Sequence, residues 1–438
     1  MASEKPTIGF VGLGAMGFGM ATNLISLGYK VRGYDVWAPT LERFKQAGGE
    51  VATSLANSAA GNAYFVCMVA SAPQVQSALF DDEKAVAKAL PQGAILILCS
   101  TVPATYAQSV RDQLIAIGRN DIHFIDAPVS GGAKRAADGT LSIMAGASDE
   151  ALEKGKFLLA EMSDANKLYL VPGGVGAGSN MKMVHQVLAA IHILAASEAM
   201  GFAAQLGLDA KEVREAIVAS EAWSWMHENR SPRMLEEDYF PGVSALTIIL
   251  KDVGIITATA RHHNFPVPLC TTAEQTYLSG LIRGFGPNDD AGMVRMYYSQ
   301  PISNVTPKSP ESSAAGIKLV LALLTNIHIC AAAEAVSFAK FLNVDMGQFY
   351  ELVNAAAGGS EMFKVRGAEM IEGAKNGTAG KRTLDEAAKE LSAVVQQARD
   401  LHCPLHLGNE ALNLLLFAKR RGWGELADTN IEKVYEAL

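Results

Sequence analysis

Two segments of the chain repeat one another, and this repeat strongly limits what the sequence can fold into. The run KMVHQVLAAIH at 182–192 aligns with KLVLALLTNIH at 318–328, an offset of 136 residues (318 minus 182). Glu198 aligns with Glu334 at the same offset, and at an offset of 138 the pair KD at 251–252 aligns with KE at 389–390. Solenoid repeats are much shorter than this period. The pattern therefore predicts two copies of one helical domain.

The N-terminal part follows a different pattern, in which short β-prone runs alternate with helix-like stretches such as 16–27 and 105–117. The expected strands are 7–11, 30–35, 64–69, 94–99, 123–127 and 141–145. Such alternation predicts a parallel sheet with helices on both faces, and strand signals become scarce after about residue 166. We expect an α/β Rossmann-type domain at 1–166, followed by two tandem all-α domains at 167–304 and 305–438.

Composition supports folded domains and excludes several classes of function. The 438 residues are 49% hydrophobic and 19% charged, and the net charge of −8 argues against a nucleic-acid-binding surface. The five cysteines form no Cys-x-x-Cys pair, and no cluster has metal-ligand spacing. The polar N-terminus leaves no room for a signal peptide, and the apolar run at 187–200 is shorter than a membrane span. We expect a cytoplasmic protein with no metal, membrane or nucleic-acid partner.

A glycine-rich segment follows the first expected strand and opens a helix. The expected cofactor-binding residues there are Gly12, Leu13, Gly14, Ala15, Met16 and Gly17. Glycines in this context allow a tight turn and close approach of a pyrophosphate. Asp35 ends the next expected strand, where its carboxylate could accept hydrogen bonds from ribose hydroxyls and repel a 2′-phosphate. NAD is therefore favoured over NADP, and the alternative is a glycine turn without a ligand.

Three further positions could handle a small anionic substrate. Ser130, Gly131 and Gly132 could present a hydroxyl and backbone N–H groups to a carboxylate, although an ordinary turn explains them equally well. Lys182 could exchange a proton with a substrate hydroxyl if burial beside a nicotinamide lowered its pKa. Its alternative role is a lysine paired within a helix seam. His185 lies one turn further along and is either a substrate contact or a satisfied core histidine.

Taken together, five motifs resemble the β-hydroxyacid dehydrogenase family over about residues 5–300. They are GFVGLGAMG at 9–17, STV at 100–102, DAPVSGG at 126–132, GSNMK at 178–182 and KD at 251–252. The resemblance implies NAD-dependent oxidation of a small hydroxy acid in a cleft between a Rossmann-type and a helical domain. It also implies that Ser130, Gly131 and Gly132 bind the carboxylate, that Lys182 is the general acid/base, that Val69, Thr101 and Lys251 contact the cofactor, and that Asp252 supports the site.

Two departures from the family pattern refine this expectation. His185 stands where the family often has asparagine, and the runs at 182–193, 265–268 and 284–290 look most like the branch that oxidises four-carbon sugar acids such as L-threonate. The alternatives are a 3-hydroxyisobutyrate dehydrogenase, a tartronate semialdehyde reductase, or a non-catalytic NAD-binding scaffold protein.

The second departure is the additional copy at 312–438, which short family members lack. Those members dimerise through their helical domains, so the copy could take the place of a partner. The protein would then be a monomer with an internal pseudo-dimer, the alternative being a homodimer. Lys318 is expected not to be catalytic, because Ser312 and Ala314 replace Gly176 and Gly178 before it.

Overall fold

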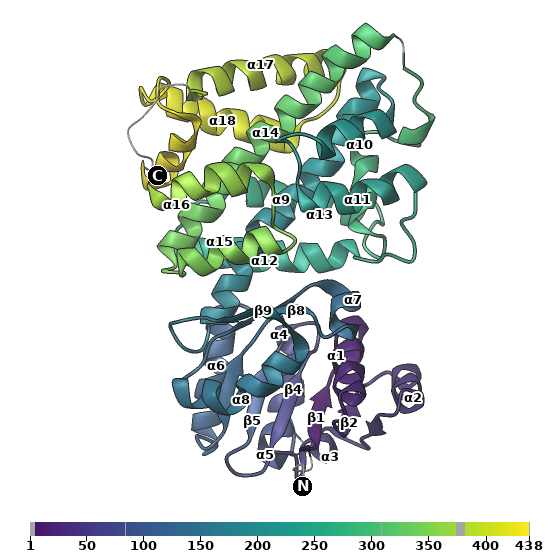
Figure 1. The fold of residues 1–438 in the computed structure, drawn as a ribbon, viewed down its shortest axis with the longest axis vertical. Helices are drawn as coiled ribbons and strands as arrows, with labels where there is room; N and C mark the ends of the chain where they lie inside the picture. The colour runs from purple at the N-terminus through teal and green to yellow at the C-terminus, as the bar shows by residue number, and fades with distance from the viewer. Residues whose placement is uncertain (1–4, 84, 308, 374–381, 438) are drawn as a thin grey trace. The chain divides into compact units, whose positions relative to one another are not determined.

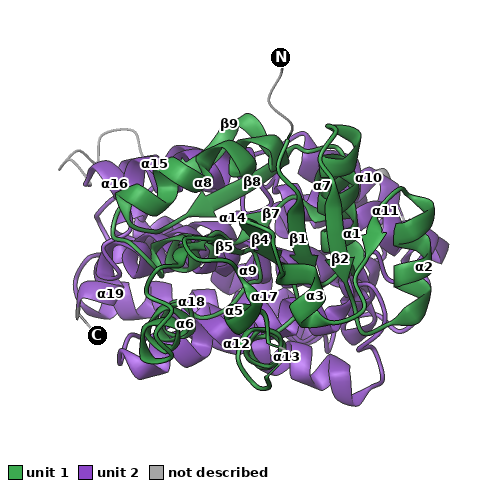
Figure 2. Cartoon of the chain, turned by 90° about the horizontal axis from the view of Figure 1, so that it is seen from below, with its two compact units in different colours: residues 1–182 green, residues 183–438 purple. Residues whose placement is uncertain are grey.

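A computed structural model describes residues 5–83, 85–307, 309–373 and 382–437. It divides the chain into two compact units, residues 1–182 and 183–438, which Figure 2 colours separately. The boundary expected at residue 166 lies inside a strand, because β9 (Ser163–Leu170) continues past it and pairs with β8 (Leu141–Ala145). The two expected helical domains both fall within the second unit.

The first unit is built on a parallel sheet of six strands in the order β3-β2-β1-β4-β5-β6. Its central strands lie side by side in Figure 1. The strands are β1 (Ile8–Val11), β2 (Val31–Tyr34), β3 (Glu50–Val51), β4 (Tyr64–Cys67), β5 (Ile95–Leu98) and β6 (His123–Asp126). The helices are α1 (Ala15–Ser26), α2 (Ala38–Gln46), α3 (Leu55–Ala59), α4 (Ala72–Leu79), α5 (Val86–Ala89), α6 (Ala104–Ala116), α7 (Gly132–Ala137) and α8 (Asp149–Met162). The expected Rossmann-type architecture is confirmed.

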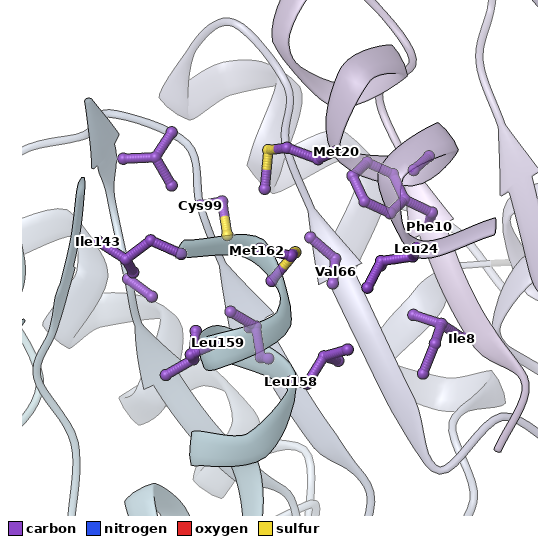
Figure 3. Close-up of a cluster of buried hydrophobic side chains, with 14 of the residues drawn as sticks. Ile8, Phe10, Met20, Leu24, Val66, Cys99, Ile143, Leu158, Leu159 and Met162 are labelled. Atoms are coloured by element: carbon purple, nitrogen blue, oxygen red, sulfur yellow. The ribbon is translucent and has the colours of Figure 1, made fainter. Parts of the chain in front are cut away.

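Both faces of this sheet are buried, which explains why its strands read as continuous apolar runs. Phe10 and Ile97 point to one face, where they pack with residues of α1, α2 and α8, as Figure 3 shows for part of this cluster. Phe65 and Leu96 point to the other face, against α3 to α6. Because side chains alternate along a strand, each strand supplies both cores.

A second, smaller sheet was not expected. β7 (Val129–Ser130) pairs antiparallel with β8, and β8 pairs parallel with β9, so residues 141–145 do not extend the six-stranded sheet. Only Ala127 and Pro128 separate β6 from β7. A parallel neighbour would need a crossover of a dozen residues or more, and the chain instead turns out of the large sheet.

The second unit is helical, with two long helices at its centre. Its helices are α9 (Ala177–Leu206), whose first residues belong to the first unit, α10 (Ala210–Val218), α11 (Trp225–Glu236), α12 (Leu246–His262), α13 (Pro268–Ile282), α14 (Pro310–Phe341), α15 (Met346–Ala355), α16 (Ala368–Glu372), α17 (Leu384–Asp400), α18 (His406–Arg420) and α19 (Lys433–Ala437). Short 3₁₀ or π-helical turns cover Asp290–Met296, Ile302–Asn304, Phe363–Gly367 and Asp428–Glu432.

The long helices are longer than the expected apolar run at 187–200. Ala177–Leu206 and Ser312–Phe341 are long and apolar enough to cross a membrane by length and composition, but 100% and 89% of their apolar windows are buried within the protein. His192 and Glu198 lie within α9 without interrupting it: the His192 ring packs on His328, and the Glu198 carboxylate accepts a hydrogen bond from Leu407 N. Burial of this extent is typical of core helices.

Two buried glutamates make matching contacts across the second unit. The carboxylate of Glu198 on α9 accepts hydrogen bonds from Leu407 N (3.0 Å) and Gly408 N (2.9 Å), in the first turn of α18. The carboxylate of Glu334 on α14 accepts bonds from Leu269 N and Cys270 N, both 2.9 Å, in the first turn of α13. Each carboxylate satisfies N–H groups that a helix start leaves without partners.

Two further sets of contacts join equivalent positions of the two aligned segments. Trp225 N donates to Gly359 O (2.9 Å), while Glu361 N donates to Trp223 O (3.1 Å). The rings of His192 and His328 lie 4.4 Å apart. In these reciprocal contacts residue i meets j, and the counterpart of j meets the counterpart of i.

Candidate active site

The glycine-rich loop lies between β1 and α1 and is held by Asp35. Gly12 has φ +88°, and a Cβ there would collide with the carbonyl oxygen of Met68, so the position requires glycine. Leu13 N donates to Asp35 Oδ2 (2.7 Å), and Trp37 N donates to Asp35 Oδ1 (2.9 Å). No side chain caps α1 at Gly14. The start of α1 can therefore offer backbone N–H groups to a phosphate.

Two other predicted cofactor contacts follow the neighbouring strands of the sheet. Val69 comes after β4 and Thr101 after β5, and Val69 N donates to Ser100 Oγ (2.9 Å). From β1 the strands β2 and β3 are added on one side of the sheet, and β4, β5 and β6 are added on the other. The strand order therefore reverses at β1, which is the topological switch point of the sheet. Dinucleotides bind beyond the carboxyl ends of the strands at such a point. The structure thus brings the predicted cofactor-binding residues of the first unit to one edge of the large sheet.

The predicted carboxylate-binding segment has the backbone that its glycines allow. Ser130 ends β7 and is buried, while Gly131 and Gly132 are exposed, with φ of +142° and +74°. Positive φ values of this kind favour glycine. The chain therefore turns sharply into α7 and leaves backbone groups at the surface.

Asp126, in the same motif, holds the helix that carries Lys182. Its carboxylate accepts hydrogen bonds from Gly176 N (3.1 Å), Ser179 N (2.8 Å) and Ser179 Oγ (2.7 Å). Burial raises the pKa of Asp126 to about 6, although the bonds from Ser179 oppose that rise. Lys182 lies one turn after Ser179 and is only 5% exposed. Sequence reasoning did not assign this anchoring role, because the three donors lie about 50 residues away.

In the second unit the predicted residues form a chain of hydrogen bonds. Gly358 N donates to His185 Nε2 (3.1 Å), and His185 Nδ1 lies 3.1 Å from Gln186 Oε1. Gln186 Nε2 donates to Asp252 Oδ2 (2.6 Å), and Asp252 Oδ1 pairs with Lys251 Nζ at 3.1 Å. His185, Asp252 and Lys251 are thus linked. Gln186 and Gly358 were missed: the first is adjacent to His185, and the second carries no side chain to signal it.

Other candidate chemistry is not supported within the described ranges. Lys318, the counterpart of Lys182, is exposed on α14. The five cysteines are buried and form no disulfide. Among the residues that the structure describes, no group of three or more His, Cys, Asp or Glu side chains could hold a metal ion.

Comparisons with known proteins match both parts of the chain. The family model for the NAD binding domain of 6-phosphogluconate dehydrogenase matches residues 7–173. The model described as NAD-binding of NADP-dependent 3-hydroxyisobutyrate dehydrogenase matches twice, at residues 176–297 and 312–435. L-Threonate dehydrogenase of Cupriavidus necator is 38% identical over 290 residues, which cover 66% of this chain and 95% of that protein.

Solved structures give the same answer. A 3-hydroxyisobutyrate dehydrogenase from Salmonella typhimurium has 33% identity and a TM-score of 0.61, covering 67% of this chain and 100% of its own. The 6-phosphogluconate dehydrogenase of Plasmodium falciparum has 16% identity and a TM-score of 0.63, and its fold covers 94% of this chain and 92% of its own. The latter likeness concerns the fold alone.

The Rossmann-type domain, its glycine loop and these matches define an NAD(P)-binding oxidoreductase that acts on a CH–OH group. The chain belongs to the 3-hydroxyisobutyrate dehydrogenase-like family of β-hydroxyacid dehydrogenases, near L-threonate dehydrogenase.

Proposed function

We propose that the protein oxidises a four-carbon sugar acid such as L-threonate, using NAD as cofactor and Lys182 as general acid/base. The observation that carries this proposal is a buried lysine placed one turn after a helix start that Asp126 anchors. A buried amine loses its proton more readily than an exposed one. The substrate class is supported by 38% identity to an L-threonate dehydrogenase.

Each group of predicted residues has its own role in this reaction. A bound nicotinamide would accept the hydride. Lys182 takes the hydroxyl proton as the carbonyl forms, and returns it in the reverse direction. Ser130, Gly131 and Gly132 hold the substrate carboxylate, Asp252 faces its hydroxyl groups, and His185 acts on the substrate side through Gln186 and Asp252. Gly12 to Gly17, Asp35, Val69, Thr101 and Lys251 hold the cofactor.

NAD is preferred in this proposal because of Asp35. Its carboxylate lies at the end of β2, where ribose hydroxyls are bound in related folds, and would repel a 2′-phosphate. The two bonds from Leu13 N and Trp37 N fix its orientation. They also leave lone pairs on both oxygens for a ribose, because a carboxylate can accept about four hydrogen bonds.

The test is a coupled assay with threonate, erythronate, glycerate and 3-hydroxyisobutyrate, each with NAD and with NADP. Tartronate semialdehyde is assayed in the reducing direction. We expect the highest kcat/KM for L-threonate with NAD. A higher kcat/KM for 3-hydroxyisobutyrate or tartronate semialdehyde would show that the proposed substrate is wrong. A preference for NADP would show that the proposed cofactor is wrong. Cofactor binding without any turnover would indicate a non-catalytic scaffold protein.

We also propose that residues 167–304 and 305–438 are copies that pack as an internal pseudo-dimer. One family model matches both parts, and the Glu198 and Glu334 contacts are reciprocal. A second copy covalently joined in this way occupies the surface that a partner chain would need.

Light scattering tests the pseudo-dimer. We expect the mass of one chain, 46.4 kDa, across micromolar concentrations. A stable species of twice that mass, dissociated by substitutions on α9 at its contacts with the second copy, would contradict the proposal.

A further inference from the structure

We infer that the second helical copy completes the substrate side of the active site, through the loop at residues 356–360, here called the Gly358 loop. This inference rests on the proposed function, because it assigns a role at the same site. Gly358 acts as a positioning residue: its backbone N–H orients His185, and His185 in turn orients Gln186 and Asp252. The second copy then contributes to substrate binding as well as to packing.

The Gly358 loop is fixed against the first copy by backbone bonds. Gly359 O accepts from Trp225 N (2.9 Å), and Ser360 forms an antiparallel bridge with Ser224. Gly358 is buried, and its N–H reaches His185 Nε2 at 3.1 Å. None of the His185 surface is exposed. The loop therefore presents its N–H group to the ring from a rigid support.

The two copies differ at the positions that make this contact. In the first copy the equivalent N–H, that of Ala222, donates locally to Ser220 Oγ (3.2 Å). In the second copy alanine replaces Ser220 at position 356, so no local hydroxyl is present for Gly358 N. His185 has Leu321 as its counterpart, which cannot accept a hydrogen bond. The residues equivalent to Gly358 and His185 therefore cannot form this contact.

The hydrogen bond from Gly358 N sets the donor and the acceptor of each following hydrogen bond, from His185 to Gln186 and from Gln186 to Asp252. Because Nε2 accepts a hydrogen bond from Gly358 N, that nitrogen carries no proton, so the ring proton lies on Nδ1 and is donated in a hydrogen bond to Gln186 Oε1. The Gln186 amide group must then point its NH₂ toward Asp252 Oδ2, at 2.6 Å. Asp252 also pairs with Lys251. Loss of the Gly358 bond would allow the ring to adopt the other tautomer and Gln186 to flip.

Two adjacent glycines provide a matched test. A Cβ at Gly358 would lie 3.2 Å from His185 Cδ2 and 3.3 Å from Nε2. A Cβ at Gly359 would be equally tight, 3.2 Å from Val353 O and 3.3 Å from Ala356 O, but it would not touch His185. Both substitutions crowd the same loop to a similar degree. Only Gly358→Ala pushes on the histidine.

We expect Gly358→Ala to raise KM for the hydroxy acid about tenfold, which corresponds to the weakening of one hydrogen bond. Its kcat should fall less, and its KM for NAD should stay within about twofold. Gly359→Ala should match the wild type in all three values. Combined with His185→Leu, Gly358→Ala should add no further loss, because both act through the same ring. Equal KM values for the two glycine variants would overturn the inference.

The histidine tautomer gives a readout that a merely structural loop would not change. In the full-length wild type, ¹⁵N NMR should show His185 protonated on Nδ1 alone, and Gly358→Ala should add the Nε2-protonated form. An unchanged tautomer in that variant would also overturn the inference. If the wild type turned over no hydroxy acid, the proposed function would fail, and the NMR comparison would still decide whether Gly358 orients His185.

Discussion

Replacing Lys182 by alanine is expected to lower kcat for hydroxy acid oxidation by about 10²–10⁴-fold, the usual loss when a general acid/base is removed. Without the amine, the proposed acceptor of the hydroxyl proton is missing, and alanine offers no group that can replace it. NAD binding should persist within about twofold, because the glycine loop and Asp35 do not involve this side chain. Steady-state kinetics and a fluorescence titration with NADH measure the two effects.

Lys318→Ala is the matched control. Lys318 occupies the equivalent position on α14 but is exposed and lacks the preceding glycines. Its removal should change kcat by less than about twofold. Unchanged turnover in Lys182→Ala, or an equal loss in Lys318→Ala, would remove Lys182 from the mechanism.

The second large effect concerns stability. Glu198→Ala and Glu334→Ala should each lower the free energy of unfolding by on the order of 3 kcal/mol, because each leaves two buried N–H groups of a helix start without acceptors. For a unit of this size the unfolding midpoint should fall by roughly 5–10 °C. The reciprocal contacts predict losses of similar size. Calorimetry measures them.

Two exposed glutamates that occupy equivalent positions in the two aligned segments provide the control. Glu215 and Glu351 are aligned at the 136-residue offset and are both exposed. Their alanine variants should stay within about 0.5 kcal/mol of the wild type. A large loss for only one of the two buried glutamates would contradict the two-fold arrangement.

The same carboxylates predict a pH dependence. Burial raises the pKa of Glu198 and Glu334 from 4.5 to about 7 in the folded protein, although their hydrogen bonds oppose the rise. Between pH 4.5 and 7 the folded state therefore binds more protons than the unfolded state, and stability falls as pH rises through this window. The double variant Glu198→Gln, Glu334→Gln should flatten this slope, because glutamine does not titrate.

The sequence predicted most of the large sheet, because strands buried on both faces are apolar at every position. It did not predict β9, whose first residues Ser163 to Lys167 are largely polar. It did not predict β3 or β7 either, each only two residues long. These strands are defined by their pairing with neighbours, which local composition does not encode.

In the candidate site, too, some residues were predicted from the sequence and others were not. Asp35 was predicted from its place at the end of the second strand of a glycine-loop pattern, and the roles of Lys182 and Asp252 were predicted from the family resemblance of their motifs. The acceptors and donors that hold them were not, since Asp126 binds backbone N–H groups about 50 residues away and Gly358 is 173 residues from His185. Backbone groups leave no signature in the residue type.

The proposed duplication has an evolutionary consequence. In a symmetric homodimer every substitution occurs in both subunits at once, so a change that helps one face of the interface must be tolerated by the other. In the proposed internal pseudo-dimer the two halves are encoded separately, and position 185 holds histidine while position 321 holds leucine. One half can thus specialise for chemistry and the other for support, and each can drift under its own selection.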